Sequence, residues 1–215
     1  MQGRTALESV VLLHGFGGHP FQTRLLARRL KNANFDVRVI GYPSWSWPLD
    51  RIADHVHLQL AGDERRLHFV GHSMGGLILR AYLTRYKPAR LGRAVMLGTP
   101  NSGSELADLV HDLGLHGPIL NRAGPCLRTR RPTSVDTCLG TVDYPLGVIA
   151  GDRSPNPLAN IIFHAPNDGM VSVAATHVPG QTDHLVMPVQ HATLIYSRPV
   201  ANQIIHFLRT GEFER

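Results

Sequence analysis

Long apolar runs, lysine and cysteine are scarce in this 215-residue sequence. No run reaches the roughly eighteen apolar residues that a membrane-spanning helix needs, so we expect no such helix. The opening residues, Met1-Gln2-Gly3-Arg4-Thr5, contain no signal-peptide core, which predicts a cytoplasmic protein unless a leader has been removed. Repeats and low-complexity tracts are also lacking, which predicts a single domain over residues 1–215.

The positive charge of the chain comes from arginine. Lys31 and Lys87 are the two lysines in a chain whose formal net charge is +6. The arginines are scattered apart from Arg128, Arg130 and Arg131, and no basic stripe alternates with aromatic residues. This pattern argues against nucleic-acid binding and favours a solvated basic surface. A weak attraction to an anionic lipid surface stays open.

Two cysteines, Cys126 and Cys138, lie in one irregular stretch of the chain. A disulfide that closes this loop and a pair of reduced thiols are both compatible with the spacing, and we favour the reduced pair. Neither cysteine follows a strand and a turn, so neither is expected to be a nucleophile.

Apolar runs alternate with amphipathic segments along most of the chain. We expect strands at Ser9–Leu13, Phe35–Ile40, Leu67–Val70, Ala94–Leu97, Gly147–Ala150 and His184–Met187. We expect helices at Pro20–Leu30, with Leu25, Leu26 and Leu30 on its apolar face, and at Leu49–Leu60, Leu77–Tyr86, Glu105–Leu113 and Pro199–Leu208. Strands that alternate with helices over short connections predict a parallel sheet covered on both faces.

One long segment, residues 100–144, interrupts this alternation. It is rich in Gly, Pro, Asn and Arg, and it is too long for an ordinary connection. Its apolar residues favour a packed cap over a disordered insertion; they are Leu106, Leu109, Val110, Leu113, Leu115, Ile119 and Leu120. We expect a short cap helix whose apolar face, including Leu109 and Leu113, contacts the substrate.

The most informative motif is Gly71-His72-Ser73-Met74-Gly75. It directly follows the apolar run Leu67–Val70 and precedes a helical pattern. A sharp turn between a strand and a helix presents a serine hydroxyl at the edge of a sheet, and it needs small residues two positions before and after the serine. We therefore predict that Ser73 is a nucleophile.

With this motif in place, the chain resembles the alpha/beta hydrolases, especially the small bacterial serine lipases and esterases. The other motifs that carry the resemblance are His14-Gly15-Phe16-Gly17-Gly18, Gly98-Thr99-Pro100-Asn101-Ser102-Gly103, Asn167-Asp168-Gly169-Met170-Val171 and the run from His191 to Ser197. The resemblance implies a minimal α/β fold with about six mostly parallel strands, helices on both faces, and a cap insertion (100–144) after the fourth strand. Two additional antiparallel strands, present in larger members, have no room before the His-Gly turn.

A serine hydroxyl is a weak nucleophile and needs an adjacent base, typically histidine, whose far nitrogen is held by a carboxylate. In this fold the three residues come in a fixed order along the sequence: the serine first, then the acid, then the histidine. Four of the histidines lie late enough to qualify: His177, His184, His191 and His206. His191 is the preferred base because it follows the last strand, at the carboxyl edge of the sheet, whereas His184 lies at the start of that strand.

Two aspartates compete for the role of the acid. Asp152 directly follows the fifth strand, where many members of the family carry their acid. Asp168 lies in an Asn-Asp-Gly-Met-Val turn, the form that the resemblance implies for the acid loop, and it is our choice. Asp152 would then be a turn residue that bonds local backbone N–H groups.

The resemblance also assigns the oxyanion hole to the backbone N–H groups of Phe16 and Met74. It implies no metal and no organic cofactor. The expected substrate is a small-molecule ester or lipid with an apolar acyl part, and Trp45, Trp47 and Phe163 could line its pocket.

Several alternatives stay open from the sequence. The same triad would serve a thioesterase, an amidase or an acyltransferase, and a hydrolase-like fold can also act as a non-catalytic binding module. The sequence does not indicate an oligomeric state.

Overall fold

Six strands form one sheet in the computed structural model, which describes residues 8–114, 124–155 and 157–215. The strands are β1 (Ser9–Leu13), β2 (Asp36–Ile40), β3 (Leu67–His72), β4 (Leu91–Leu97), β5 (Leu146–Gly151) and β6 (Asp183–Met187). Their order is β2-β1-β3-β4-β5-β6, and every neighbouring pair is parallel. The predicted α/β class and the predicted set of strands are confirmed, with ends that shift by up to three residues.

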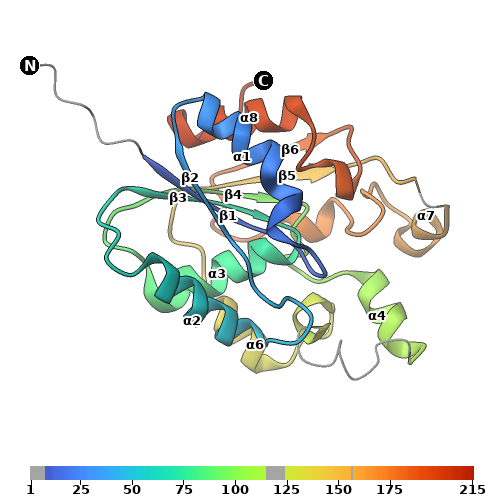
Figure 1. The fold of residues 1–215 in the computed structure, drawn as a ribbon. Coiled ribbons are helices and arrows are strands. Elements are labelled where there is room, and N and C mark those ends of the chain that lie inside the picture. The colour runs from blue at the N-terminus through green and yellow to red at the C-terminus, as the bar shows by residue number, and fades with distance from the viewer. Residues whose placement is uncertain (1–7, 115–123, 156) are drawn as a thin grey trace, which may run out of the picture.

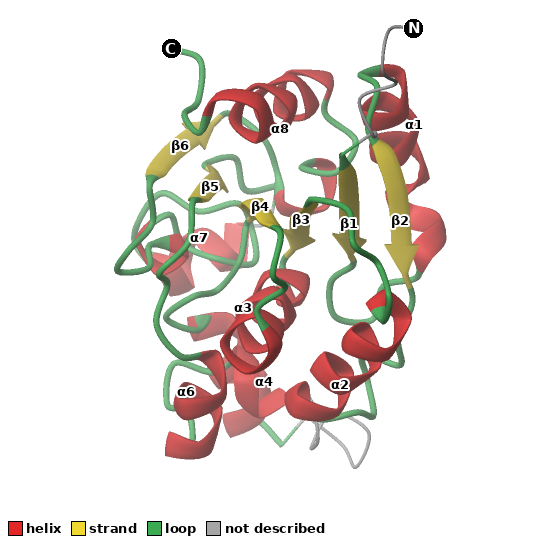
Figure 2. Cartoon of the chain, turned by 90° about the vertical axis from the view of Figure 1, so that its left-hand side faces the viewer, coloured by secondary structure: helices red, strands yellow, loops and turns green. Residues whose placement is uncertain are grey.

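Helices cover both faces of this sheet (Figure 1). The helices α1 (Arg24–Asn32) and α8 (Arg198–Thr210) lie on one face. The opposite face carries α2 (Leu49–Leu60) and α3 (Met74–Tyr86), and Figure 2 shows the layers from the side. The two helix layers explain why the central strands are continuous apolar runs, since such strands are buried on both faces.

Strand β1 illustrates this burial. Val10 and Leu12 pack into the apolar cluster beneath α1 and α8, whereas Val11 and Leu13 pack into the cluster beneath α2 and α3. All four side chains are at most 1% exposed. Full burial of each such side chain stabilises the fold by about 1.5–3 kcal/mol, so this strand anchors the loop that follows it.

The order in which strands are added to the sheet reverses at β1, and this reversal positions the loops that follow β1 and β3. After β2 the chain crosses back over β1 and adds β3 on its other side. The loops that leave the carboxyl ends of β1 and β3 therefore diverge and leave a crevice between them. Open parallel sheets bind their ligands in a crevice of this kind.

The first predicted helix differs from the expectation. A 3₁₀ turn (η1, Pro20–Thr23) precedes α1, which begins at Arg24. Leu25 is 41% exposed, and the buried face of the helix consists of Leu26, Ala27 and Leu30. Leu25 therefore lies on the solvent side of the helix.

The segment 100–144 contains α4 (Glu105–Asp112), the 3₁₀ turn η2 (Gly124–Leu127) and α6 (Thr133–Leu139). Helix α6 packs against α3, and Leu139, Val142 and Tyr144 belong to the main core. Leu115, Ile119 and Leu120 lie outside the described residues. The sequence pattern did not indicate α6 or α7 (Pro157–Phe163), since both are single short pieces of seven residues with little periodicity.

Cys126 is buried and Cys138 half-buried, and these two described residues are not joined by a disulfide. Within the described ranges, every helix is too short or too polar to cross a membrane.

Candidate active site

Ser73 lies at the turn between β3 and α3, in a backbone conformation that non-glycine residues rarely adopt. Its φ is 54° and its ψ is −125°. Such a conformation costs on the order of 1–3 kcal/mol and persists only where the surroundings enforce it. Strain at a serine that lines a cavity indicates a functional turn rather than a packing turn.

The glycines of this turn are required by close backbone contacts. A Cβ on Gly71 would lie 2.6 Å from backbone atoms of Gly75 and Gly76. A Cβ on Gly75 would lie 2.3 Å from the carbonyl oxygen of Leu13, and one on Gly76 would lie 2.0 Å from Thr99 Oγ1. No real Cβ tolerates the backbone distances at Gly71 and Gly75, so the turn can form only with glycine at these two positions, whereas at Gly76 the side chain of Thr99 occupies the space.

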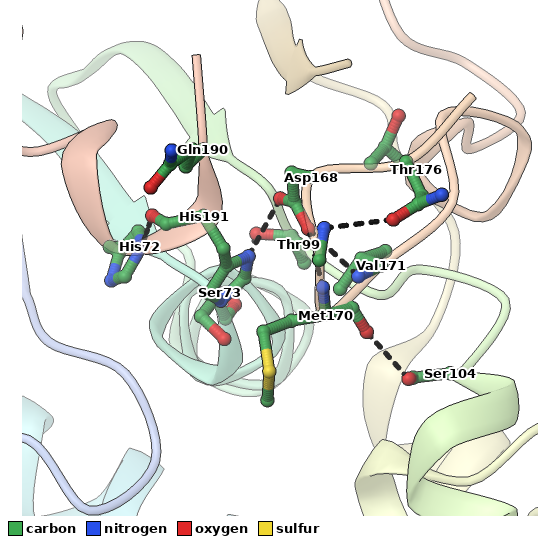
Figure 3. Close-up of polar contacts among 12 residues, drawn as sticks. His72, Ser73, Thr99, Ser104, Asp168, Met170, Val171, Thr176, Gln190 and His191 are labelled. Carbon is green, nitrogen blue, oxygen red and sulfur yellow. Dashed lines mark hydrogen bonds and ion pairs between the residues drawn. The ribbon is translucent and has the colours of Figure 1, made fainter. Parts of the chain in front are cut away.

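His191 and Asp168 are brought together beside this turn (Figure 3). The ring nitrogen Nδ1 of His191 lies 2.7 Å from Asp168 Oδ2, and the backbone N–H of His191 donates to the Asp168 carbonyl at 2.9 Å. An Nδ1–H that donates to a carboxylate leaves Nε2 as the acceptor. Ser73 and His191 line the same cavity, so Nε2 is available to the serine side of the site.

The carboxylate of Asp168 is fully held by the protein. Asp168 is 1% exposed, and its Oδ1 accepts the backbone N–H groups of Met170 at 3.0 Å and Val171 at 2.8 Å. Asp152 is different: its nearest ionic neighbour is Arg153 at 3.6 Å, and no contact with His191 exists among the described residues. The geometry therefore pairs His191 with Asp168.

Gly98, which directly follows β4, lies behind this pair. A Cβ at Gly98 would lie 2.9 Å from Asp168 Oδ2 and 3.1 Å from His191 Nδ1, and its φ of 54° also favours glycine. The Gly-Thr-Pro motif thus has a structural reason: any side chain there would separate the acid from the histidine. Thr99 completes the arrangement, because its hydroxyl donates to the Ser73 carbonyl at 3.0 Å.

The loop after β1 approaches Ser73 from the other side. A Cβ on Gly15 would lie 3.1 Å from Ser73 Cβ, and Phe16 lines the cavity. The next residues tie the loop down, since Gly17 N–H donates to Ser44 Oγ at 3.0 Å and Gly18 N–H donates to Gly15 O at 3.1 Å. Met74 begins α3, and its side chain is buried in the core. Its backbone N–H is at the helix N-terminus, where such groups lack helical acceptors.

His14 has a structural environment. Its ring stacks on Tyr42 with centroids 4.0 Å apart, its Nδ1–H donates to Gly15 O at 2.9 Å, and its Nε2 accepts from Tyr42 N–H at 3.4 Å. Burial lowers the pKa of His14, so the ring stays neutral and holds the loop. It is not positioned as a second base.

A cavity of about 410 Å³ lies over Ser73 and has mostly apolar walls. Its cap side is formed by Leu106, Ala107 and Val110 of α4 together with Leu127. The expected cap residues differ: Leu109 and Leu113 are not part of the wall, and Leu113 is 62% exposed. The helix is present where the periodicity predicted it, but it is rotated so that an adjacent stripe faces the cavity.

The aromatic residues expected at the pocket also lie elsewhere. Trp45 is 47% exposed and packs edge-on against Phe16 with ring centroids 5.2 Å apart, so it supports the wall from behind. Trp47 packs against His55 and Arg51 of α2, and Phe163 is buried in α7. These three residues do not line the cavity.

A sequence model of the alpha/beta hydrolase fold matches residues 8–160. The chain belongs to the alpha/beta hydrolase family. Lipase 1 of Psychrobacter immobilis is 32% identical over 93 residues, a match that covers 39% of this chain and 29% of that protein. The aligned part of this chain therefore spans less than a third of the length of Lipase 1.

Solved structures share the fold at lower identity. The mature form of the Bacillus licheniformis lipase BlEst2 has a TM-score of 0.76 at 20% identity and covers 98% of this chain and 94% of that chain. The propeptide form of the same lipase has a TM-score of 0.78 at 20% identity. That match covers 95% of this chain and 51% of the propeptide form. The phospholipase PlaB of Legionella pneumophila has a TM-score of 0.74 at 18% identity, over 95% of this chain and 59% of that chain.

One residue of the family motif was not singled out in the sequence. His72, directly before Ser73, lines the cavity, and its Nε2 lies 3.1 Å from the carbonyl oxygen of His191. Its position in the sequence could have indicated it. Because His72 directly precedes the predicted nucleophile Ser73, and the predicted base His191 must lie beside Ser73, His72 is expected near the loop that carries His191. His184, by contrast, lies at the start of β6, and its Nε2 is 2.9 Å from Thr176 Oγ1.

Proposed function

We propose that this protein hydrolyses carboxylic esters through an acyl-enzyme on Ser73. The observation that carries the proposal is the convergence of three features in one apolar cavity: a strained serine, a histidine held 2.7 Å from a buried aspartate, and a glycine-rich loop beside the serine. Each feature alone has a structural explanation, but together they form the arrangement that acyl transfer requires.

The chemistry follows from these positions. Ser73 Oγ attacks the acyl carbonyl carbon while His191 Nε2 takes its proton, and Asp168 stabilises the imidazolium through Nδ1–H. The N–H groups of Phe16 and Met74 donate to the developing oxyanion. The ester C–O bond then breaks, and the alcohol leaves with the proton from His191. Water attacks the carbonyl carbon of acyl-Ser73 as His191 Nε2 takes its proton. The bond from that carbon to Ser73 Oγ then breaks, His191 returns the proton to Ser73 Oγ, and the carboxylic acid leaves.

The apolar wall of the cavity favours an ester with an apolar acyl chain. Relatives named as a lipase and a phospholipase agree with this substrate class. Assays of matched p-nitrophenyl esters, an acyl thioester and an acyl anilide test the class. Ester cleavage at the highest kcat/KM supports the proposal, whereas preferred cleavage of the thioester or the anilide would make this protein a thioesterase or an amidase.

The cap helix provides a test of the acyl pocket. Leu106→Asp should reduce kcat/KM for p-nitrophenyl octanoate at least tenfold more than for the acetate, because burying an unpaired carboxylate opposes chain binding. Leu113→Asp is the matched control, since Leu113 is exposed and outside the wall. An equal loss on both esters for Leu106→Asp would contradict a substrate-facing cap.

We also propose that the mouth of the cavity contacts lipid surfaces. Phe21, Met170 and Tyr196 are 65%, 48% and 43% exposed, Met170 and Tyr196 line the cavity, and Phe21 adjoins the lining residue Gln22. The Arg24 guanidinium lies over the Phe21 ring at 4.9 Å, which places positive charge beside the apolar side chain. Such a combination suits an anionic interface.

Cosedimentation with vesicles tests this contact. Phe21→Ser with Met170→Ser should weaken binding to vesicles of phosphatidylglycerol severalfold. Leu58→Ser, which alters a 71% exposed leucine on α2, should leave binding as it is. Equal binding of all three proteins would contradict the proposed surface.

A further inference from the structure

His72 contacts the backbone of the catalytic histidine but is not a member of the triad. We propose that His72 is a positioning residue, which fixes the distance between Ser73 and His191 by donating Nε2–H to the His191 carbonyl. The inference rests on the proposed function, since it concerns the reaction at Ser73.

Besides the contact with His72, three hydrogen bonds hold His191, and two of them come from the same residue. The backbone N–H and the ring Nδ1–H of His191 both donate to Asp168, at 2.9 and 2.7 Å. Both contacts tie His191 to the acid loop, and neither relates it to the nucleophile. The backbone N–H of Leu194 also reaches the His191 carbonyl at 3.4 Å, but it belongs to the histidine loop itself.

His72 supplies the missing connection. It is the last residue of β3 and the neighbour of Ser73, and its Nε2 lies 3.1 Å from the His191 carbonyl oxygen (Figure 3). Its ring centroid lies 5.0 Å from that of His191. On its other edge, Nδ1 lies 3.3 Å from where a Cβ on Gly15 would be. One imidazole thus extends from the nucleophile strand, bonds the histidine loop and lies beside the oxyanion loop.

The chemical state of His72 suits this role. Because a carbonyl oxygen only accepts, Nε2 must carry the ring proton in this contact. Burial, reinforced by the charge of His191, lowers the pKa of His72 to about 3, so the ring is a neutral donor at any pH at which the triad works. A neutral donor holds the loop without adding a second positive charge beside the imidazolium that forms on His191.

The test compares His72→Gln with His72→Met. The two replacements have nearly the same length, but only the glutamine amide can donate to the His191 carbonyl. His72→Met should lower kcat for a p-nitrophenyl ester by on the order of 10–100-fold, the effect expected of a misplacement near 1 Å. KM should stay within about twofold because the cap wall that binds the acyl chain, including Leu106 and Val110, is unchanged. His72→Gln should recover most of the lost kcat. His72→Phe provides a second variant without a donor that keeps a ring in the space.

Controls separate this effect from loss of stability and from failure of the mechanism. His184→Met removes another partly buried histidine with a hydrogen bond, so it should lower the melting temperature without changing kcat. Equal kcat values for His72→Gln and His72→Met, a loss confined to KM, or wild-type kcat in folded His72→Met and His72→Phe would each overturn the inference. Ser73→Ala is assayed in parallel: activity in that variant would refute the proposed function, whereas an inactive Ser73→Ala beside a fully active His72→Met would refute only the role of His72.

Discussion

Ser73→Ala is expected to reduce ester hydrolysis by on the order of 10⁶-fold, since Ser73 is the residue on which the proposed acyl intermediate forms. The remaining rate should be that of direct attack of water on the bound ester. The fold should survive, because alanine is smaller than serine and the glycines around the turn are unchanged. Steady-state hydrolysis of p-nitrophenyl butyrate and a circular-dichroism melting curve measure the two quantities.

Ser102→Ala is the matched control for this variant. Ser102 is exposed on the loop after β4 and does not line the cavity, so its replacement should leave hydrolysis close to wild type. Wild-type hydrolysis in folded Ser73→Ala would refute the acyl-enzyme mechanism as a whole.

His191→Ala is expected to be nearly as damaging as Ser73→Ala, because the nucleophile and its base act as a unit and their effects do not add. Without an imidazole, the Ser73 proton has no acceptor and the departing alcohol has no acid. The double variant Ser73→Ala/His191→Ala should therefore be no slower than either single variant. His184→Ala, measured beside it, should retain most of the activity, and a loss equal to that of His191→Ala would mean that the base is assigned to the wrong histidine.

The acid is tested by the same assay. Asp168→Ala should reduce turnover by on the order of 10²–10⁴-fold, because His191 loses the group that holds its Nδ1 tautomer. Asp152→Ala should cost far less, since Asp152 contacts Arg153 rather than His191. The opposite order of effects would place the acid at the end of β5.

The sheet and the loop motifs could be predicted because each depends on local sequence. A strand buried on both faces is a continuous apolar run, as at Ser9–Leu13, whose predicted bounds are those of β1. The turn at Ser73 requires small residues at fixed offsets, and the structure shows backbone atoms within 2.6 Å of the places that larger side chains would occupy. Local constraints of this kind are visible in a single sequence.

The face of the cap helix could not be predicted in the same way. Apolar residues occupy several sides of α4, so periodicity alone does not decide which stripe faces the cavity. The rotation is set by tertiary contacts: Ser104 Oγ donates to the Met170 carbonyl at 2.7 Å, and Asp108 pairs with Arg128 at 3.2 Å. These contacts join segments that are 66 and 20 residues apart in sequence. The contact between His72 and His191 spans 119 residues and is equally absent from any local pattern.

The acyl-enzyme itself is tested most directly by a fluorophosphonate, which phosphonylates an activated serine and leaves ordinary serines unmodified. The wild-type protein is incubated with the probe, digested, and analysed by tandem mass spectrometry, with His191→Ala and Ser73→Ala treated in parallel. We expect one adduct, on Ser73, that forms far more slowly in His191→Ala and is missing in Ser73→Ala. An adduct on a different residue, or no adduct in a folded wild-type protein that hydrolyses esters, would contradict this expectation.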